Sequence, residues 1–342
     1  MEKYGVWMWP ESIYTLGADA VMDLLAAAGV TDVFLLTKGL AGKVIYHRTK
    51  LRLPTVYEER DILKEALCAA HKRGIRLHAW FTSSNDAAYK ALFPQAGNAH
   101  FLNGRDNNVI RMGDAGYVAY MADILEELFA TYALDGLHLD YVRFNHLGNG
   151  WAEEDEQLLS TRGADISKLK KLVKRTFYDE MPDAEAIFNA YRAGDKDVLA
   201  LAEYRRDTVK TFAQKMIAAA RKNRPNLPVS AALMPEGAYP DTAFSDLHYG
   251  QNYHDAAELY DFVVPMAYHV EYKKSPEWVL DVAMGAIACG NRTLAGIQAY
   301  GEGDFQAAKA AFDLVAKTNN PLLEGVCLFR YGEPACDTLL QA

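Results

Sequence analysis

Two charged residues interrupt the end of an apolar stretch near the middle of the chain. The stretch DGLHLDYVRFN spans residues 135–145 and contains Asp140 and Arg143, where burying an unpaired charge would be costly. His138 and Asp140 lie two positions apart, so they project to the same side of a strand. A carboxylate kept ionised by a neighbouring guanidinium is suited to act as a nucleophile or general base. Alternatively, an Asp140–Arg143 ion pair simply closes the end of this strand.

A second carboxyl group follows a later apolar stretch. Glu236 comes directly after LPVSAALMP, residues 227–235. Hydrolysis of a glycosidic bond commonly uses one ionised carboxylate and one protonated carboxyl that donates to the leaving oxygen. We therefore predict Asp140 as nucleophile or general base and Glu236 as general acid. Glu11 is the reserve candidate for the acid, and the alternative for Glu236 is an exposed loop residue.

Aromatic and hydrogen-bonding side chains gather at the ends of the same kind of stretch. Aromatic rings cover the C–H face of a sugar, and polar groups bind its hydroxyls. A carbohydrate is therefore the expected ligand. The predicted substrate-binding set is Trp7, Lys38, His78, Trp80, His138, Arg143, Tyr268, His269, Gln298, Tyr300 and Arg330.

Several of these residues have a structural alternative. His78 and His138 are equally compatible with histidines hydrogen-bonded inside a core. Trp7 and Trp9 share one side of a strand, so either both line its interior face or both pack under helices. Because no paired His/Cys cluster occurs, we predict no metal and no cofactor; a metal site built on His78, His138 and Asp140 would lack a further ligand. The absence of GxSxG argues against the nucleophile-elbow serine hydrolases.

Eight short apolar stretches must position these side chains. Most are apolar on both faces and alternate with helical patterns, such as those of residues 18–28 and 61–72, which is typical of a parallel sheet. Eight such units predict a closed (β/α)8 barrel of the α/β class, with its site at the carboxyl ends of the strands. GxGxxG and GxxxxGK[ST] motifs are absent, which argues against nucleotide-binding open sheets. The predicted strands are residues 4–9, 32–37, 76–81, 134–144, 227–234, 260–268, 292–300 and 325–331.

The longest connection follows the fourth predicted strand. Residues 145–203 contain charged, partly helical sequence such as AEEDEQLL and ISKLKKLVKRTFYDE. We predict one barrel domain over residues 1–342 with an insertion at 145–203 on the catalytic face. The insertion either covers a substrate groove or is only a solvated addition.

The composition limits the partners of the chain. Its formal net charge of -9 argues against a sequence-independent nucleic-acid binder, which needs a basic surface. No apolar run reaches roughly 18 residues, so we expect no membrane insertion. No signal peptide is evident. The four cysteines show no CxxC spacing, so we predict buried, unpaired residues.

The motifs resemble a known family. DGLHLDYVRF resembles the fourth-strand motif of the bacterial glycosyl-hydrolase-like family 10 proteins, also described as the DUF187 or YngK-like family. YRRDTVKTFAQKM, GQNYHDAAELYDFVVPMAYH, LAGIQAY and GVCLFRYG resemble further segments, and together they cover most of the chain from Leu134 onward. The resemblance implies a TIM barrel related to carbohydrate-active enzymes. It also implies an exported protein, whether periplasmic, extracellular or lipid-anchored, whose signal is absent from this sequence.

A more distant similarity links the fourth strand to chitinase-type barrels, whose DGLDLDWE motif ends in the catalytic acid. Here Asp140 is kept, but His138 replaces an aspartate and Val142 stands at the glutamate position. This difference argues against the chitinase mechanism, in which the acetamido group of the substrate attacks. It leaves Asp140 as nucleophile or base, with an acid from elsewhere.

The combined prediction is a glycoside hydrolase that cleaves a polysaccharide or glycan by paired-carboxylate catalysis. The alternatives are a carbohydrate-binding barrel without catalysis and a lyase or metal-dependent hydrolase on the same fold.

Overall fold

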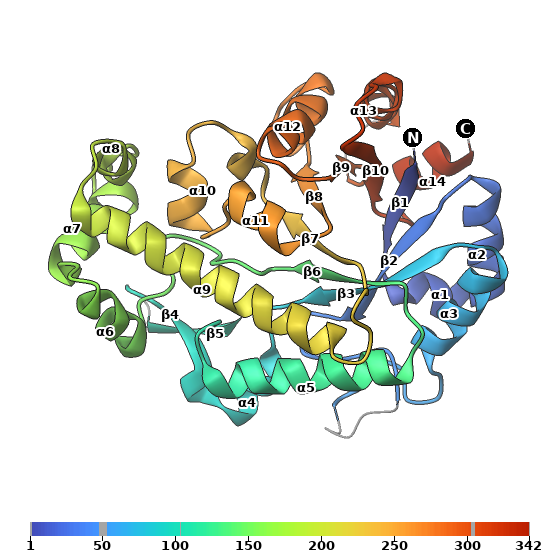
Figure 1. The fold of residues 1–342 in the computed structure, drawn as a ribbon, viewed down its shortest axis with the longest axis horizontal. Coiled ribbons are helices and arrows are strands. Elements are labelled where there is room, and N and C mark those ends of the chain that lie inside the picture. Colours follow the sequence, from blue (N-terminus) through green and yellow to red (C-terminus); the bar gives the residue numbers. More distant parts are fainter. Residues whose placement is uncertain (1, 48–52, 103, 302–304, 342) are drawn as a thin grey trace.

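Eight parallel strands close into a barrel in the computed structural model of this chain (Figure 1). The structure describes residues 2–47, 53–102, 104–301 and 305–341. The strands neighbour one another in the closed order β1-β10-β9-β8-β7-β6-β3-β2, which confirms the predicted (β/α)8 barrel. Their bounds are β1 (Lys3–Met8), β2 (Asp32–Lys38), β3 (Arg76–Thr82), β6 (Gly136–Asp140), β7 (Val229–Leu233), β8 (Phe262–Ala267), β9 (Thr293–Gln298) and β10 (Leu323–Phe329).

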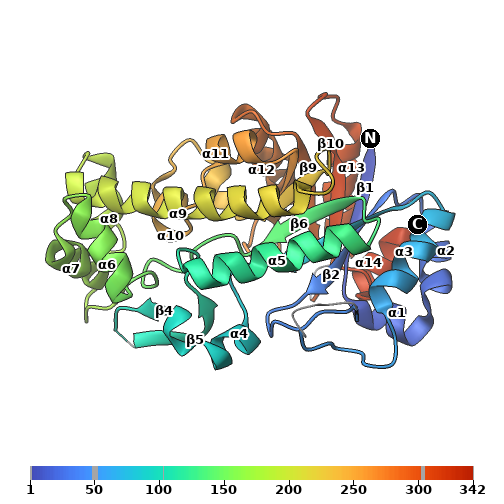
Figure 2. The same cartoon turned by 60° about the horizontal axis from the view of Figure 1, so that its bottom comes forward.

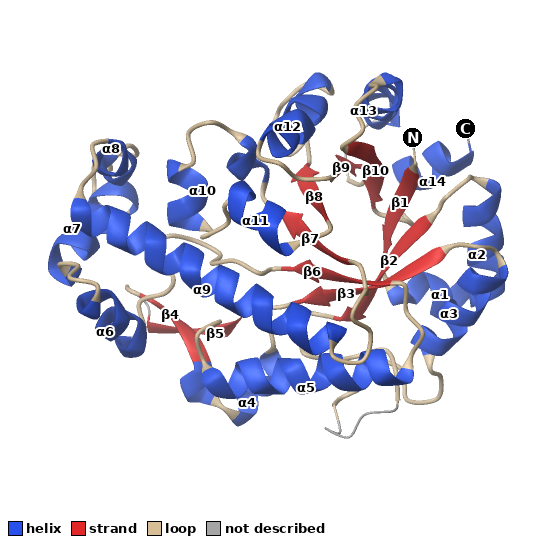
Figure 3. Cartoon of the chain, viewed as in Figure 1, coloured by secondary structure: helices blue, strands red, loops and turns tan. Residues whose placement is uncertain are grey.

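Helices cover the outside of the barrel (Figure 3). In the helix over 62–72, Asp61 caps the first turn by accepting from Lys64 N at 3.0 Å, and Gly74 leaves the last turn with a φ of 68°, as favoured by glycine. The covering helices are α1 (Pro10–Leu16), α2 (Ala18–Ala27), α3 (Ile62–Lys72), α5 (Ala115–Thr131), α9 (Lys196–Arg221), α10 (Ala243–His248), α11 (Tyr253–Leu259), α12 (Glu277–Ala288), α13 (Phe305–Lys317) and α14 (Pro334–Gln341).

The barrel strands are buried on both faces because alternate side chains point inward and outward. In β2, Phe34 belongs to the interior, whereas Val33 and Leu35 pack in the layer shared with the helices. Since side chains fill the interior, a site can form only at the ends of the strands. The interior cluster consists of Trp7, Phe34, Trp80, Ala232, Phe262, Val264, Leu294 and Cys327.

Two excursions leave the barrel at the carboxyl ends of neighbouring strands, β3 and β6, and lie at the end of the molecule away from α2 and α3 (Figures 1 and 2). The predicted insertion at 145–203 contains three helices and ends inside α9; its role over a groove stays a prediction. The first excursion was not predicted. It holds α4 (Ala87–Leu92), a 3-10 turn (Pro94–Ala96) and the antiparallel pair β4 (Gly97–His100) and β5 (Gly104–Ile110); the second holds α6 (Glu153–Thr161), α7 (Ile166–Phe177) and α8 (Ala186–Arg192).

Backbone hydrogen bonds join the two excursions. Phe101 N donates to Gly148 O at 3.1 Å, and Trp151 N donates to Ala99 O at 3.1 Å. The His100 ring also lies 2.9 Å from the Tyr178 hydroxyl. The excursions therefore form one continuous structure beyond the barrel.

The cysteines are all free, as predicted, but only two of them are buried. Cys327 and Cys336 are buried, Cys289 is half-buried and Cys68 is exposed. Cys68 faces solvent because it lies on the outer side of α3, opposite the apolar face. Within the described residues, no helix is both long and apolar enough to span a bilayer.

Candidate active site

Asp140 is the last residue of β6, at the carboxyl end of the barrel. Its side chain is only 5% exposed. Trp80 Nε1 donates to Asp140 Oδ2 at 3.1 Å, and Tyr141 N donates to Oδ1 at 2.7 Å. Because Trp80 belongs to the interior cluster, the carboxyl group faces the inside of the barrel mouth. Both of its oxygens are held in a fixed orientation.

The backbone turns sharply directly after this carboxyl group. Tyr141 has a φ of 55°, in the left-handed region that residues other than glycine seldom adopt. Strain of this kind persists where the surrounding structure imposes it, and it gathers at functional sites. The turn therefore supports a preorganised role for the end of β6.

Glu236 follows β7, the strand that pairs with β6, and lies in the 3-10 turn Pro235–Ala238. Tyr272 Oη donates to Glu236 Oε1 at 3.0 Å, while Oε2 is buried without a hydrogen-bond partner among the described residues. Burial raises the pKa of Glu236, although the hydrogen bond from Tyr272 and the charge of Arg143 oppose the shift. A carboxyl group with a raised pKa and one free oxygen is suited to proton donation.

Arg143 lies near both carboxyl groups without forming an ion pair. Its Nη1 donates to Asn145 Oδ1 at 3.2 Å, and its guanidinium lies 4.7 Å from the Tyr141 ring centroid. In the described part of the chain, no ion pair joins it to Asp140. Burial raises the pKa of Asp140, and Arg143 offsets this only partly. The predicted ion pair is thus not formed, because the Arg143 guanidinium contacts Asn145 and the Tyr141 ring instead.

Replacing Arg143 with methionine is expected to raise the pKa of Asp140 and of Glu236, because a nearby cation stabilises both carboxylates. The measurement is a carbon-13 NMR titration of the two carboxyl groups. Arg143→Lys, which keeps the positive charge, is the matched control and should titrate nearly as the unmodified protein does. Unchanged titration of both groups in Arg143→Met would show that Arg143 does not act on them.

Trp7 and His138 lie deeper in the barrel than Asp140. Trp7 Nε1 donates to His138 Nε2 at 3.0 Å, and His138 Nδ1 lies 2.9 Å from Ser230 Oγ. Burial lowers the pKa of His138 well below its usual range, so the ring is neutral. Both rings are fully buried. Their structural alternative, a hydrogen-bonded core, fits these contacts, because each lies one inward-facing position below the rim of the barrel.

His78 lies deeper still, towards the amino ends of the strands. Its Nε2 is 2.8 Å from Asp32 Oδ1, and Asp32 also binds Arg76. In the barrel register His78 pairs with Gly136, two positions before His138. This position places His78 in a polar layer away from the mouth, where it stabilises the barrel.

Three further predicted binding residues are buried at or just after the carboxyl ends of their strands. Lys38 Nζ forms an ion pair with Asp86 Oδ2 at 3.0 Å, and burial lowers the pKa of this lysine. Gln298 Oε1 accepts from Glu271 N at 3.0 Å. His269 is buried, and its ring nitrogens have no partner within the described residues. Lys38 and Gln298 thus fix loops at the mouth, because their polar atoms are taken by neighbouring chain segments.

Aromatic rings and one guanidinium form the rim over β8, β9 and β10. The half-buried Tyr268 and Tyr300 lie 5.4 and 5.3 Å from the Phe329 ring centroid. Phe329 also lies 6.1 Å from Trp80, the donor to Asp140. Arg330 follows Phe329 and binds Glu333. The structure thus brings the predicted Tyr268 and Tyr300 together, whereas Arg330 contacts Glu333 and the Trp9 ring. Phe329 was missed because a phenylalanine ending an apolar strand looks like core.

Gln251 is a second residue that sequence reasoning missed. Its Nε2 donates to Val142 O at 3.2 Å, and its Oε1 accepts from Met234 N at 3.0 Å. Val142 lies two residues after Asp140, and Met234 lies two before Glu236. The buried Gln251 therefore fixes the relative positions of the two loops that carry the carboxyl groups. The motif GQNYHDA marked this segment but gave no role for the amide.

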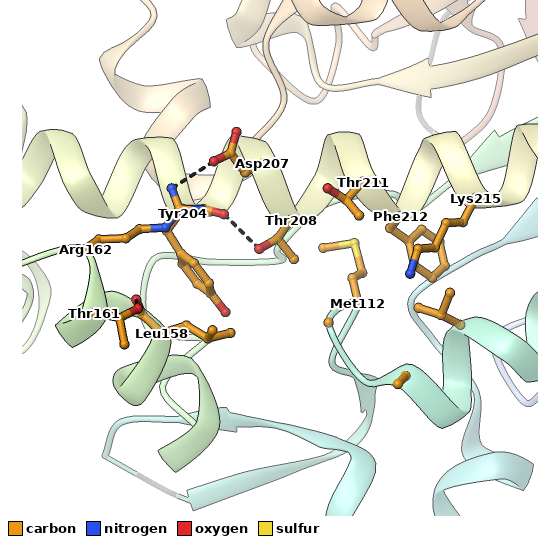
Figure 4. Close-up of a pocket in the computed structure, with 13 residues that line it drawn as sticks. Met112, Leu158, Thr161, Arg162, Tyr204, Asp207, Thr208, Thr211, Phe212 and Lys215 are labelled. Carbon is orange, nitrogen blue, oxygen red and sulfur yellow. Dashed lines mark hydrogen bonds and ion pairs between the residues drawn. The ribbon is translucent and has the colours of Figure 1, made fainter.

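A cleft of about 380 Å³ lies elsewhere, on the outside of the barrel between α5, α6 and α9 (Figure 4). The only acid in its lining is Asp207, which forms an ion pair with Arg162 at 2.8 Å. None of the predicted site residues lines it. The two predicted catalytic carboxyl groups, Asp140 and Glu236, therefore lie at the mouth and not in this cleft.

The described residues contain no cluster of ligands that would support the alternative prediction of a metal site. Over the ranges that the structure describes, no three His, Cys, Asp or Glu side chains come together as metal ligands. His78 and His138 bind other partners, as described above. Asp140 is bonded to Trp80 and Tyr141.

The barrel fold of this chain has solved structural relatives. The glycoside hydrolase domain of PgaB (BpsB) from Bordetella bronchiseptica is 12% identical, with a TM-score of 0.71 over 99% of this chain and 98% of that chain. The catalytic domain of beta-amylase from Paenibacillus polymyxa is 11% identical, with a TM-score of 0.65 over 96% and 92%. Alpha-L-fucosidase isoenzyme 2 from Paenibacillus thiaminolyticus is 14% identical, with a TM-score of 0.66 over 99% of this chain and 48% of that chain.

At these identities the likeness shows the fold alone. No family model and no curated protein sequence matches the chain.

Proposed function

We propose that this chain is a glycoside hydrolase that cleaves a polysaccharide or glycan with Asp140 and Glu236. The observation that carries the proposal is that two carboxyl groups with raised pKa values follow adjacent strands, one at the end of β6 and one in the turn after β7. Titratable groups with perturbed pKa values gather at active sites. The fold relatives that act on sugars agree with this proposal.

The two carboxyl groups differ in a way that supports the roles we propose for them. Glu236 has a buried, unpartnered Oε2, which would carry the proton given to the leaving oxygen. Both oxygens of Asp140 accept hydrogen bonds from N–H groups, which oppose the larger effect of burial on its pKa and orient it as nucleophile or general base. The anomeric configuration of the first product, followed by proton NMR, distinguishes these two roles of Asp140.

The rim supplies the contacts that a sugar requires. Tyr268 and Tyr300 offer half-buried rings and hydroxyl groups at the rim. The charge of Asp140 contributes to the raised pKa of Tyr268, after the larger effect of burial. Rings of this kind cover sugar C–H faces. We assign sugar binding to these tyrosines and Arg330 rather than to the buried Trp7, His78 and His138.

The motif resemblance further supports membership in the DUF187 or YngK-like family and export from a bacterial cell. Detection of the native protein in a bacterial envelope or culture-medium fraction would test the second part of this proposal.

Glu236→Gln is expected to lower cleavage of a natural glycan by about 10²- to 10⁴-fold, because the glutamine cannot donate the proton to the leaving oxygen. Purified protein would be screened against a glycan panel by the release of reducing ends. An aryl glycoside with an acidic phenol as leaving group needs less protonation, so its cleavage should fall much less.

Glu11→Gln is the matched control, since Glu11 is an exposed acid in α1 and was the reserve candidate. It should cleave at the unmodified rate. Glycan binding without any release of reducing ends by the unmodified protein would instead favour a carbohydrate-binding barrel.

A further inference from the structure

Trp9 presents an exposed indole at the rim of the barrel. It follows β1 directly and is 38% exposed, whereas Trp7, two positions earlier, is 1% exposed. The Arg330 guanidinium lies 3.6 Å from the Trp9 ring centroid, and Arg330 Nη2 donates to Glu333 Oε1 at 2.5 Å. An ion-paired cation thus covers the ring and holds it in place. The indole remains partly open to solvent instead of joining the core.

The closed strand order places Trp9 across the mouth from the proposed acid. Going round the barrel, β1 is separated from β7 by three strands on either side. An eight-stranded barrel is roughly 15 Å across, which exceeds the width of one pyranose ring. The strands that carry Trp9 and Glu236 are therefore farther apart than the width of one sugar unit.

The aromatic rim connects the two positions. Phe329 contacts the rings of Trp80 and Tyr268 on the side of Asp140, and the next residue, Arg330, covers Trp9. A glycan chain leaving the carboxyl pair along this rim would meet aromatic faces up to Trp9.

We infer that Trp9 is a stacking subsite for a sugar unit distant from the bond that is cleaved. The substrate is accordingly an oligosaccharide or polysaccharide that crosses the mouth, not a short glycoside. This inference rests on the proposed function, because it uses Asp140 and Glu236 as the point of cleavage. An indole face is the preferred aromatic surface for the C–H face of a pyranose, since it offers the largest ring area.

The test is affinity gel electrophoresis of the full chain carrying Asp140→Asn, which prevents cleavage. The gels contain laminarin, xylan, dextran, glycol chitosan or polygalacturonate. We expect at least one polysaccharide to retard the protein, and adding Trp9→Ala to weaken that affinity roughly tenfold. Trp9→Phe keeps an aromatic face and should retain most of the affinity.

Phe93→Ala is the matched control, because Phe93 is 42% exposed but follows α4 in the first excursion; it should leave retardation unchanged. Equal retardation of the Trp9→Ala protein and its parent, or no retardation by any of the five polymers, overturns the inference. The release of reducing ends by protein with Asp140 intact is a separate readout. If it is absent while retardation depends on Trp9, the proposed hydrolysis is refuted and only sugar binding at Trp9 stands.

Discussion

Asp140→Asn is expected to lower glycan cleavage by roughly a thousandfold or more while the protein stays folded. The amide has nearly the shape of the carboxyl group and can still accept one of the two hydrogen bonds from Trp80 and Tyr141. It cannot attack the sugar or accept a proton from water. The loss should therefore appear in kcat, with substrate affinity largely kept.

The same substitution has a second expected signature in the dependence of stability on pH. Because burial raises the pKa of Asp140 in the folded state, the folded protein holds this proton more tightly than the unfolded chain. Its contribution to stability is present below the unfolded pKa and is lost as pH rises through the folded pKa. The Asp140→Asn protein should not lose this stability as pH rises. Its free energy of unfolding should therefore depend less on pH between the unfolded and folded pKa values of Asp140.

Chemical denaturation at several pH values and a reducing-end assay measure the two signatures. Asp155→Asn is a matched control. Asp155 is also a buried acid, but it lies in α6 of the second excursion and binds Arg111 and Tyr204. It should lower stability and leave the chemical step of the folded protein intact. Normal cleavage by Asp140→Asn would overturn the assignment of Asp140.

The barrel was predictable from the sequence because its signal is local. Each strand is a short apolar run between periodic helices, and the inward parity of His138 and Asp140 followed from alternation alone. The antiparallel pair β4 and β5 was missed because its sequence, GNAHFLNGRDNNVI, is largely polar. It lacks the alternation of apolar and polar residues that marks a half-buried strand. Its strands are stabilised by the second excursion, a contact that no local pattern encodes.

The site was predicted less completely, because depth and partners depend on residues far apart in the chain. Parity placed His138 and Asp140 on one side but could not say that only Asp140 reaches the rim. The partner of His78 is Asp32, which is 46 positions away. Trp7 and Trp9 share a side, yet only Trp9 lies beyond the packed interior. These differences in depth arise because the packed interior of the barrel ends between His138 and Asp140 on β6 and between Trp7 and Trp9 on β1.

Arg205 is a buried residue whose loss is expected to cost considerable stability. It lies on α9 and is 0% exposed. Its Nη2 donates to Leu147 O at 3.1 Å and also to Asn149 O, and its Nη1 donates to His248 O at 3.1 Å. Burial lowers the pKa of this arginine to about 9, so it remains charged at neutral pH. One guanidinium thus binds carbonyl groups of the loops that follow Asp140 and Glu236.

Arg205→Met would leave these carbonyl oxygens without their donor, and we expect the free energy of unfolding to fall by about 2–4 kcal/mol. Arg205→Lys keeps the charge but has fewer donors in a different geometry, so its loss should be intermediate. Arg206→Met is the matched control on the same helix: Arg206 is half-buried and pairs with Asp255 at 2.8 Å, and losing a pair of this kind costs about 1 kcal/mol or less.

Urea denaturation of the three variants compares these losses directly. Equal losses for Arg205→Met and Arg206→Met would show that the carbonyl contacts do not stabilise the loops. A larger loss for Arg205→Met, together with weaker glycan cleavage by the fraction that remains folded, would show that the same guanidinium also fixes the segments that carry the two carboxyl groups. Those segments leave adjacent strands and have few hydrogen-bonding partners in common besides Gln251, so their relative position depends on such buried side chains.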